Sequence, residues 1–204
     1  RINGKVTDII RPHTDSPPAK IAIVQTDNVE ELWSPIFWEK WHREIDKHAV
    51  DPRRMEHDHV EIGATPIKTK YGWLLIYSHI EHYFSSSDNL RPQFGIEALL
   101  LDLKDPHKII GRTKGPLMVP EESYELSGHV SNIVFPSGAL LRDETLTIYY
   151  GASDTTICSA RVNLSDLVST ISIETGWRYR FKRLEGNPII TLIENHPWES
   201  KATF

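Results

Sequence analysis

The chain has 204 residues, which is enough for one sizeable domain or for part of a larger protein. Its net charge of −5 argues against a nucleic acid or an anionic membrane as partner, because both require a basic surface. The single cysteine, Cys158, excludes an intrachain disulfide and a cysteine-based zinc cluster, and its apolar neighbours favour a buried thiol. Since no apolar run approaches ~18 residues and no signal peptide is recognisable, we expect a cytoplasmic protein that does not span a membrane.

Three segments of the chain follow one plan, in which a turn leads into a short apolar strand and a polar loop leads into a second one. The copies are residues 4–13 with 19–32, 71–79 with 94–106, and 142–154 with 156–167. Their anchors Ile10, Ile76 and Ile148 lie 66 and 72 residues apart, a spacing typical of a large structural repeat. Each copy has room for about four short antiparallel strands, which is one blade of a β-propeller.

This pattern predicts an all-β fold of about three propeller blades. A β-sandwich is the alternative, but it would place strands every ~8–12 residues without the long period. Closed propellers have ~4–8 blades, because closure of the ring protects its edge strands. We therefore expect either a piece of a longer protein, as the opening at Arg1 also suggests, or a ring completed by another copy in a homo-oligomer.

Helix is expected in two places. In residues 37–50, Trp38, Trp41, Ile45 and His48 recur at three or four positions, which fits a helix or a decorated loop. The tryptophans would then pack over a pocket or against each other. Residues 163–170 are expected to form a turn or two of helix after a strand.

The segment 57–61, His-Asp-His-Val-Glu, carries groups that can do chemistry. On a strand, His57, His59 and Glu61 share one face, and two histidines with a carboxylate can bind zinc or iron. No spacing fixes a fourth ligand, so no metal site is assigned. Glu61 is instead a candidate general base if its surroundings raise its pKa. Its alternative role is a solvated carboxylate paired with a nearby lysine.

Equivalent strand ends approach one another around one mouth of a propeller. Arg11 follows the strand of the first copy and His79 ends that of the second, so both are candidates for binding an anion. Asp154 holds the matching place in the third copy, where it either forms an Asx-turn or accepts hydroxyl groups of a sugar beside the tyrosines. Phe135 belongs to the core unless Pro136 turns it toward the mouth.

Four stretches of the sequence together resemble one family. They are IGATPIKTKYGWLLIYSH (62–79), FGIEALLLDLKDPHKIIGRTKGPLMVPEESYE (94–125), SNIVFPSGALL (131–141) and IYYGASDT (148–155). They are similar to glycoside hydrolase family 130, the mannoside phosphorylases and related β-mannosidases, over about residues 1–167. The resemblance implies a five-bladed β-propeller with a central mannoside pocket. It further implies inverting cleavage of a β-mannosidic bond in a mannose-containing oligosaccharide, by phosphate to give mannose 1-phosphate or by water.

The resemblance also implies roles for individual residues. Asp154 matches a sugar-binding aspartate and Phe135 a pocket aromatic, and we place Asn132 and Tyr77 with them as substrate-binding candidates. Arg11 matches an arginine that holds phosphate. Inorganic phosphate is then a possible co-substrate, and no cofactor is expected.

Two positions depart from the phosphorylase pattern. Family phosphorylases read Tyr-His-Gly after the GWLLI strand, whereas here the histidine is His79, one place late and on the opposite face of a regular strand. They also tend to carry lysine where this chain has Glu61. A carboxylate disfavours a bound phosphate dianion and suits activation of water, so a hydrolase with Glu61 as base is the second interpretation.

The expected proton donor of the family lies in a Tyr-Asp-Pro-Arg-type motif upstream of the segment equivalent to Arg1. Residues 51–53, Asp-Pro-Arg, imitate this motif at a different place. We therefore expect residues 1–172 to be the later blades of the propeller. Residues 173–204, whose stretches 178–190 and 198–204 resemble the opening of a family member, would form a linker with the start of a further unit or a closing strand. A carbohydrate-binding propeller without the acid is the non-catalytic alternative.

Overall fold

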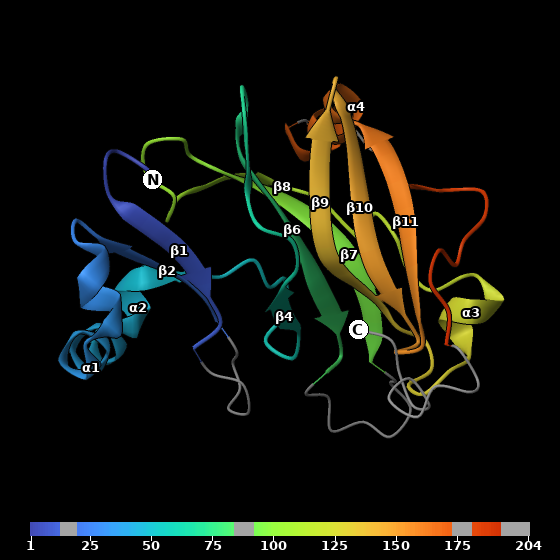
Figure 1. The fold of residues 1–204 in the computed structure, drawn as a ribbon, viewed down its shortest axis with the longest axis horizontal. Helices are drawn as coiled ribbons and strands as arrows, with labels where there is room; N and C mark the ends of the chain where they lie inside the picture. The colour runs from blue at the N-terminus through green and yellow to red at the C-terminus, as the bar shows by residue number, and fades with distance from the viewer. Residues whose placement is uncertain (13–19, 84–91, 173–180, 193–204) are drawn as a thin grey trace.

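The computed structural model describes residues 1–12, 20–83, 92–172 and 181–192 (Figure 1). Antiparallel strands in these residues form three sheets. The first sheet has the order β1 (Val6–Ile10), β2 (Ile21–Thr26), β3 (Ala49–Val50). The second has the order β4 (His59–Ile62), β6 (Gly72–Glu81), β7 (Gln93–Leu101), β8 (Ile109–Arg112), with β5 (Ile67–Thr69) also paired to β6. The third has the order β12 (Lys182–Arg183), β11 (Thr156–Asn163), β10 (Thr145–Ala152), β9 (Val134–Arg142).

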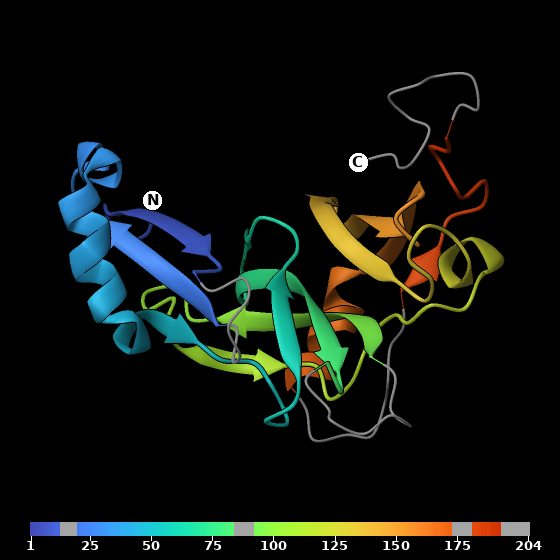
Figure 2. The same ribbon diagram turned by 90° about the horizontal axis from the view of Figure 1, so that it is seen from below.

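Each of the three predicted copies forms one hairpin of one sheet. β1 pairs with β2, β6 with β7, and β10 with β11, each in antiparallel register. The sheets follow one another along an arc (Figure 2). The all-β prediction and the three-sheet repeat are therefore confirmed for this part of the chain, while the number of blades in a closed ring stays a prediction.

Two apolar cores fill the spaces between neighbouring sheets. Between the first and second sheets, Ile21, Ile23, Val50 and Val60 pack against Leu75 and its neighbours on β6 and β7. Between the second and third sheets, a larger core joins the opposite faces of β6 and β7 to β9, β10 and β11, and α4 (Leu164–Ser172) closes it. β6 and β7 are thus covered on both sides, which makes the second sheet the centre of the described structure.

The predicted helical stretches are helical. After the short 3₁₀ helix η1 (Val29–Trp33), Ser34 caps α1 (Pro35–Arg43) by accepting the N–H of Phe37, and α2 (Ile45–His48) follows. Trp38 lies edge-on to Trp41, with ring centroids 5.6 Å apart, and Trp41 is buried against the first sheet. These aromatic rings therefore pack against each other and against the first sheet. α4 confirms the second helical prediction, and one further short helix, α3 (Ser123–Leu126), was not predicted.

The strand directions bring several candidate residues to the same side of all three sheets. β1, β6 and β10 all end at the lower side in Figure 1, and the antiparallel strands β4 and β9 begin there. Residues that follow β1 or β10, or that stand at the start of β4 or β9, therefore lie on this side. We call it the mouth, and Figure 2 views the structure from this side.

None of the helices in the described residues is long and apolar enough to cross a membrane. β12 adds a fourth strand to the third sheet by pairing with β11. The division of the chain after residue 172 stays a prediction. Residues 178–180 and 198–204, on which part of the expected family-like tail falls, lie outside the described residues.

The second and third sheets are in close contact at Gly63. A Cβ atom at this position would lie 2.5 Å from Cγ of Pro136 and 2.6 Å from the carbonyl oxygen of Ile76. The backbone oxygen cannot move aside without shifting β6, so only glycine fits between these strands.

We expect Gly63→Ala to lower the free energy of unfolding by about 1–3 kcal/mol, because it overpacks a rigid contact. Gly138→Ala is the matched control, since nothing lies within 4 Å of its added Cβ atom. Denaturant unfolding followed by intrinsic fluorescence measures both. Equal stability of the two variants would show that the contact between the second and third sheets opens at Gly63 without cost to admit a Cβ atom.

Candidate active site

Arg11 and Glu61 meet at the mouth although they belong to different sheets. Arg11 follows β1, and its guanidinium donates to the carboxylate of Glu61 on β4. Nε2 of His59 lies 3.0 Å from the same carboxylate oxygen, and the His59 ring stacks on Tyr83 with centroids 4.6 Å apart. Arg11 was expected to lie beside His79, and the structure pairs it with Glu61 instead. His59 shares the face of Glu61, as strand alternation requires.

The surroundings of Glu61 lower the pKa of its carboxyl group. The hydrogen bond with His59 is the largest cause, burial opposes it, and the positive charge of Arg11 adds to the lowering. The sequence interpretation of Glu61 as a base assumed a raised pKa, and the structure shows the opposite direction. Glu61 is consequently ionised at neutral pH, as a proton acceptor must be, but it is held by an arginine.

His79 lies in the interior between the first and second sheets. Its side chain is about 1% exposed, and its Nε2 lies 3.3 Å from a carboxylate oxygen of Asp58. Burial lowers the pKa of His79, which favours the neutral ring. The structure thus places this candidate for phosphate binding away from Arg11, on the opposite face of the second sheet from Glu61.

Tyr77 lies on the same interior face as His79. It is fully buried, and its hydroxyl donates to Oε2 of Glu97 at 2.9 Å. Arg54 donates to the other oxygen of Glu97 and lies 3.4 Å from Nδ1 of His79. Tyr77 therefore belongs to a buried polar cluster rather than to a surface that faces the mouth.

The remaining candidates gather on the third sheet. Asp154 occupies the turn between β10 and β11, where Ser153 and Asp154 both have positive φ, 48° and 53°, and Thr155 donates its N–H to Ala152 at 3.1 Å. This is the geometry of a type I′ turn, which aspartate tolerates. Asp154 is exposed, and no described residue hydrogen-bonds its carboxylate. The bonds that hold the turn come from the main chain and from the hydroxyls of Ser153 and Thr155, so none of the described bonds uses the Asp154 carboxylate.

Asn132 and Phe135 flank this turn. The main chain joins the two segments, because Ser153 donates its N–H to the carbonyl of Ile133 at 3.0 Å. Asn132 is exposed with φ of 63°. Phe135 pairs with Gly151 across β9 and β10, and its half-buried ring lies on the opposite face from the buried Val134 and Pro136. Two groups of candidates therefore stand at the mouth, one around Arg11 and one around Asp154.

Sequence reasoning missed the buried charges that hold these segments. They are Glu97 on β7 with Arg54 from the loop before β4, and Glu125 on α3 with Arg183 on β12. Glu97 interrupts the otherwise apolar strand β7, and such a carboxylate in a strand covered on both sides signals a buried partner. Arg54, Glu125 and Arg183 lie in segments whose sequence carries no comparable signal.

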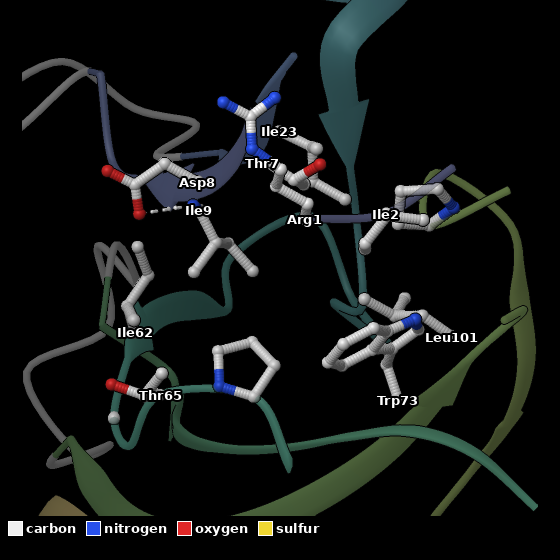
Figure 3. Close-up of a pocket in the computed structure, with 13 residues that line it drawn as sticks. Arg1, Ile2, Thr7, Asp8, Ile9, Ile23, Ile62, Thr65, Trp73 and Leu101 are labelled. Carbon is white, nitrogen blue, oxygen red and sulfur yellow. Dashed lines mark hydrogen bonds between the residues drawn. The ribbon is translucent and has the colours of Figure 1, made fainter. Parts of the chain in front are cut away.

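A separate cavity of about 270 Å³ lies between the first and second sheets (Figure 3). Thr7, Asp8 and Ile9 of β1 line one side, and Ile62 and Trp73 line the other. Its walls are largely apolar, and none of the predicted site residues contributes to them. The predicted site is thus distinct from this cavity.

No group of three or more His, Cys, Asp or Glu side chains in the described residues is arranged to hold a metal ion. His57 is exposed in the turn before β4 rather than beside His59 on the strand. The shared face expected for His57, His59 and Glu61 is therefore formed by His59 and Glu61 without His57.

Residues 34–172 match a family model described as beta-1,4-mannooligosaccharide phosphorylase. The chain belongs to glycoside hydrolase family 130. The resemblance seen in the sequence is therefore confirmed. Glu61, Asn132, Phe135 and Asp154 lie within the matched residues, whereas Arg11 precedes them.

Characterised members of family 130 show similar sequences. A 1,2-beta-oligomannan phosphorylase from Thermoanaerobacter sp. is 36% identical over 167 residues, which cover 82% of this chain and 49% of the relative. A beta-1,4-mannooligosaccharide phosphorylase from Ruminococcus albus is 29% identical over 84% of this chain and 48% of its own length. This chain thus spans about half the length of these relatives, which are phosphorylases of mannosides with different linkages.

The solved structures agree in fold. A beta-1,2-mannobiose phosphorylase from Listeria innocua, solved in complex with beta-1,2-mannobiose, aligns with a TM-score of 0.65 and 28% identity. The alignment covers 85% of this chain and 45% of that one. The described sheets are therefore arranged as in part of a family 130 enzyme.

The lowered pKa of Glu61 predicts how stability depends on pH. A carboxyl group whose pKa is lower in the folded protein stabilises it above the unfolded pKa of about 4.5, and this stabilisation is lost as pH falls through the folded value. We expect Glu61→Gln to be less stable than the wild type at pH 7 and the difference to shrink below pH 4.5. Unfolding in urea at several pH values measures it.

Glu39→Gln on the exposed face of α1 serves as the control, because its side chain is 69% exposed. A difference between wild type and Glu61→Gln that stays constant from pH 7 to pH 3 would contradict the pairing of Glu61 with Arg11 and His59.

Proposed function

We propose that this protein cleaves β-mannosidic bonds, with the third sheet holding the mannoside and the Arg11–Glu61 pair facing the acceptor that attacks it. The observation that carries the proposal is the exposed carboxylate of Asp154, held on a rigid turn beside Asn132 at the mouth of a family 130 fold. Carboxylate and amide groups next to an aromatic ring are suited to a sugar, whose hydroxyls they bind and whose C–H face the ring covers.

The names of the relatives favour phosphate as the acceptor. In an inverting reaction the acceptor attacks the anomeric carbon from the face opposite the leaving oxygen, while a proton passes to that oxygen. Arg11 offers two parallel donors, which fit a phosphate group. A bound phosphate would take the place of the Glu61 carboxylate on this guanidinium. The product of this route is mannose 1-phosphate.

Hydrolysis is the second candidate, and the Arg11–Glu61 ion pair favours it. With Glu61 ionised against Arg11, the positive charge that a phosphate dianion needs is already neutralised. The same carboxylate can instead accept a proton from an attacking water molecule. The motif of the family's proton donor does not occur in this sequence, so these residues supply sugar binding and the acceptor side of the reaction alone.

Incubation of the full-length protein with β-1,2- and β-1,4-mannobiose, with and without phosphate, distinguishes the two reactions. Phosphorolysis yields mannose 1-phosphate only when phosphate is present, whereas hydrolysis yields mannose at the same rate in either buffer. We expect cleavage by one of these routes. Binding of mannobiose without cleavage would instead support the non-catalytic carbohydrate-binding alternative.

Asp154→Asn tests the sugar contact. Asparagine also adopts positive φ, so the turn is retained while the charge is lost. We expect mannobiose binding to weaken by about 1–3 kcal/mol, the usual contribution of a hydrogen bond to a charged group. Titration calorimetry measures the affinity.

Asp143→Asn is the matched control, because Asp143 also has positive φ, 47°, in the turn between β9 and β10 at the opposite end of the third sheet. Unchanged affinity in Asp154→Asn would remove Asp154 from the site.

A further inference from the structure

A buried carboxylate, Glu125, lies beneath the two segments that carry Asn132 and Asp154. Glu125 on α3 is 0% exposed. Tyr150 donates its hydroxyl to Oε1 at 2.8 Å, and the backbone N–H groups of Glu121 and Glu122 donate to Oε2 at 2.8 and 3.0 Å. Arg183 donates to both oxygens, at 2.7 Å each. This carboxylate therefore has five donors and is fixed in place.

The fixed side chain also fixes the main chain at Glu125. The carbonyl oxygen of Glu125 accepts the hydroxyl of Ser153 at 2.6 Å and the N–H of Ile133 at 3.2 Å. Ile133 follows Asn132 and Ser153 precedes Asp154 in the chain. One residue thus anchors both segments that present candidate sugar-binding groups.

Close packing leaves these segments little freedom. A Cβ atom at Gly128 would lie 2.5 Å from Cβ of Ser153, so the loop after α3 lies directly on the turn. Val130 donates its N–H to the carbonyl of Ser153 at 3.1 Å. The position of the turn relative to Asn132 therefore depends on where α3 is held.

Arg183 is the group that holds α3, and it comes from β12, which is far away in the sequence. Besides Glu125, it donates to the carbonyl of Val119 at 2.9 Å and to a carboxylate oxygen of Glu121 at 3.2 Å. Replacing a buried ion pair by apolar residues is often neutral or stabilising, so stability alone gives little reason for this arrangement.

We propose that Arg183 and Glu125 are positioning residues that set the spacing between Asn132 and Asp154 for a bound mannoside. The proposal rests on the proposed function and adds to it a role for β12, which follows residue 172 and whose Arg183 donates to Glu125, Glu121 and Val119. Arg183 acts through Glu125, and Glu125 acts through the main chain at Ile133 and Ser153.

The test combines backbone hydrogen exchange with enzyme kinetics in Arg183→Met. Exchange is measured at the amides of Val130, Ile133 and Ser153, whose protection reports the anchored segments directly. We expect exchange at these amides to be at least about tenfold faster in Arg183→Met, because local opening becomes easier. We expect KM for mannobiose to rise about tenfold with a smaller change in kcat, since the chemistry is not touched.

Val162→Ala is the control for general destabilisation. Val162 is buried in the core at the end of β11 that is remote from Asp154. Concentrations of urea are chosen so that the control and Arg183→Met have equal global stability. Glu125→Gln and Arg183→Lys, which keep the volume or the charge, provide the same measurements if Arg183→Met does not fold, and Arg183→Lys is expected to recover part of the affinity.

The outcomes separate the two proposals. Faster exchange together with a raised KM, in the Arg183 variants but not in Val162→Ala, supports the positioning role. Exchange no faster than in Val162→Ala overturns it whatever the kinetics, and faster exchange with unchanged KM overturns it as well. Failure of the wild-type protein to bind or cleave mannobiose overturns the proposed function itself, which the exchange measurement does not report.

Discussion

Burial of both faces of the central hairpin, β6 with β7, is the constraint on which the rest of the structure depends. Leu74 and Ile76 face the third sheet, whereas Leu75 and Tyr77 face the first. A strand covered on both sides cannot slip by one residue without exchanging the two sets, so its register is fixed. Because the outer sheets pack against this hairpin, its register also fixes where their strand ends lie. The mouth therefore results from packing far from any candidate ligand.

A strand covered on both sides leaves no water for polar groups, and the protein meets this with two similar arrangements. In the second sheet, the Glu97 carboxylate accepts hydrogen bonds from the hydroxyl of Tyr77 and the guanidinium of Arg54. Beside the third sheet, the Glu125 carboxylate accepts hydrogen bonds from the hydroxyl of Tyr150 and the guanidinium of Arg183. In each case a carboxylate, a phenol and an arginine satisfy one another, as buried charges require. The arginines come from loops and edge strands, so these arrangements tie the periphery to the sheets.

The sequence predicts the repeat well because local features of the sequence are enough to identify it. The alternation of Val, Ile, Tyr and Leu with turn residues, and the spacing of Ile10, Ile76 and Ile148, identify three hairpins without any knowledge of their packing. The placement of Arg11 and Asp154 on one side also follows, because equivalent strand ends share one side of the repeat. The partner of Arg11 does not follow, because that argument paired it with His79 and the structure pairs it with Glu61.

Other parts of the site depend on contacts that no local pattern records. Whether His79 faces the mouth or the interior depends on which face of β6 meets the first sheet, and the structure places it inside. The pKa of Glu61 depends on a histidine two positions away and on an arginine from another sheet. The partners of Glu125 lie as far away as Arg183, 58 positions along the chain, so only the folded structure brings them together.

The inner edge of the first sheet shows how a free strand can be protected. Among the described residues β1 pairs with β2 alone, whereas β6 and β10 have partners on both sides. Unpaired N–H groups along such an edge attract strands of other molecules. In β1 the carboxylate of Asp8 accepts the N–H of Ile9 at 2.8 Å (Figure 3). An approaching strand must first displace this side chain and then bury its negative charge, a penalty that discourages adventitious aggregation while leaving the backbone itself ready for a correct neighbour.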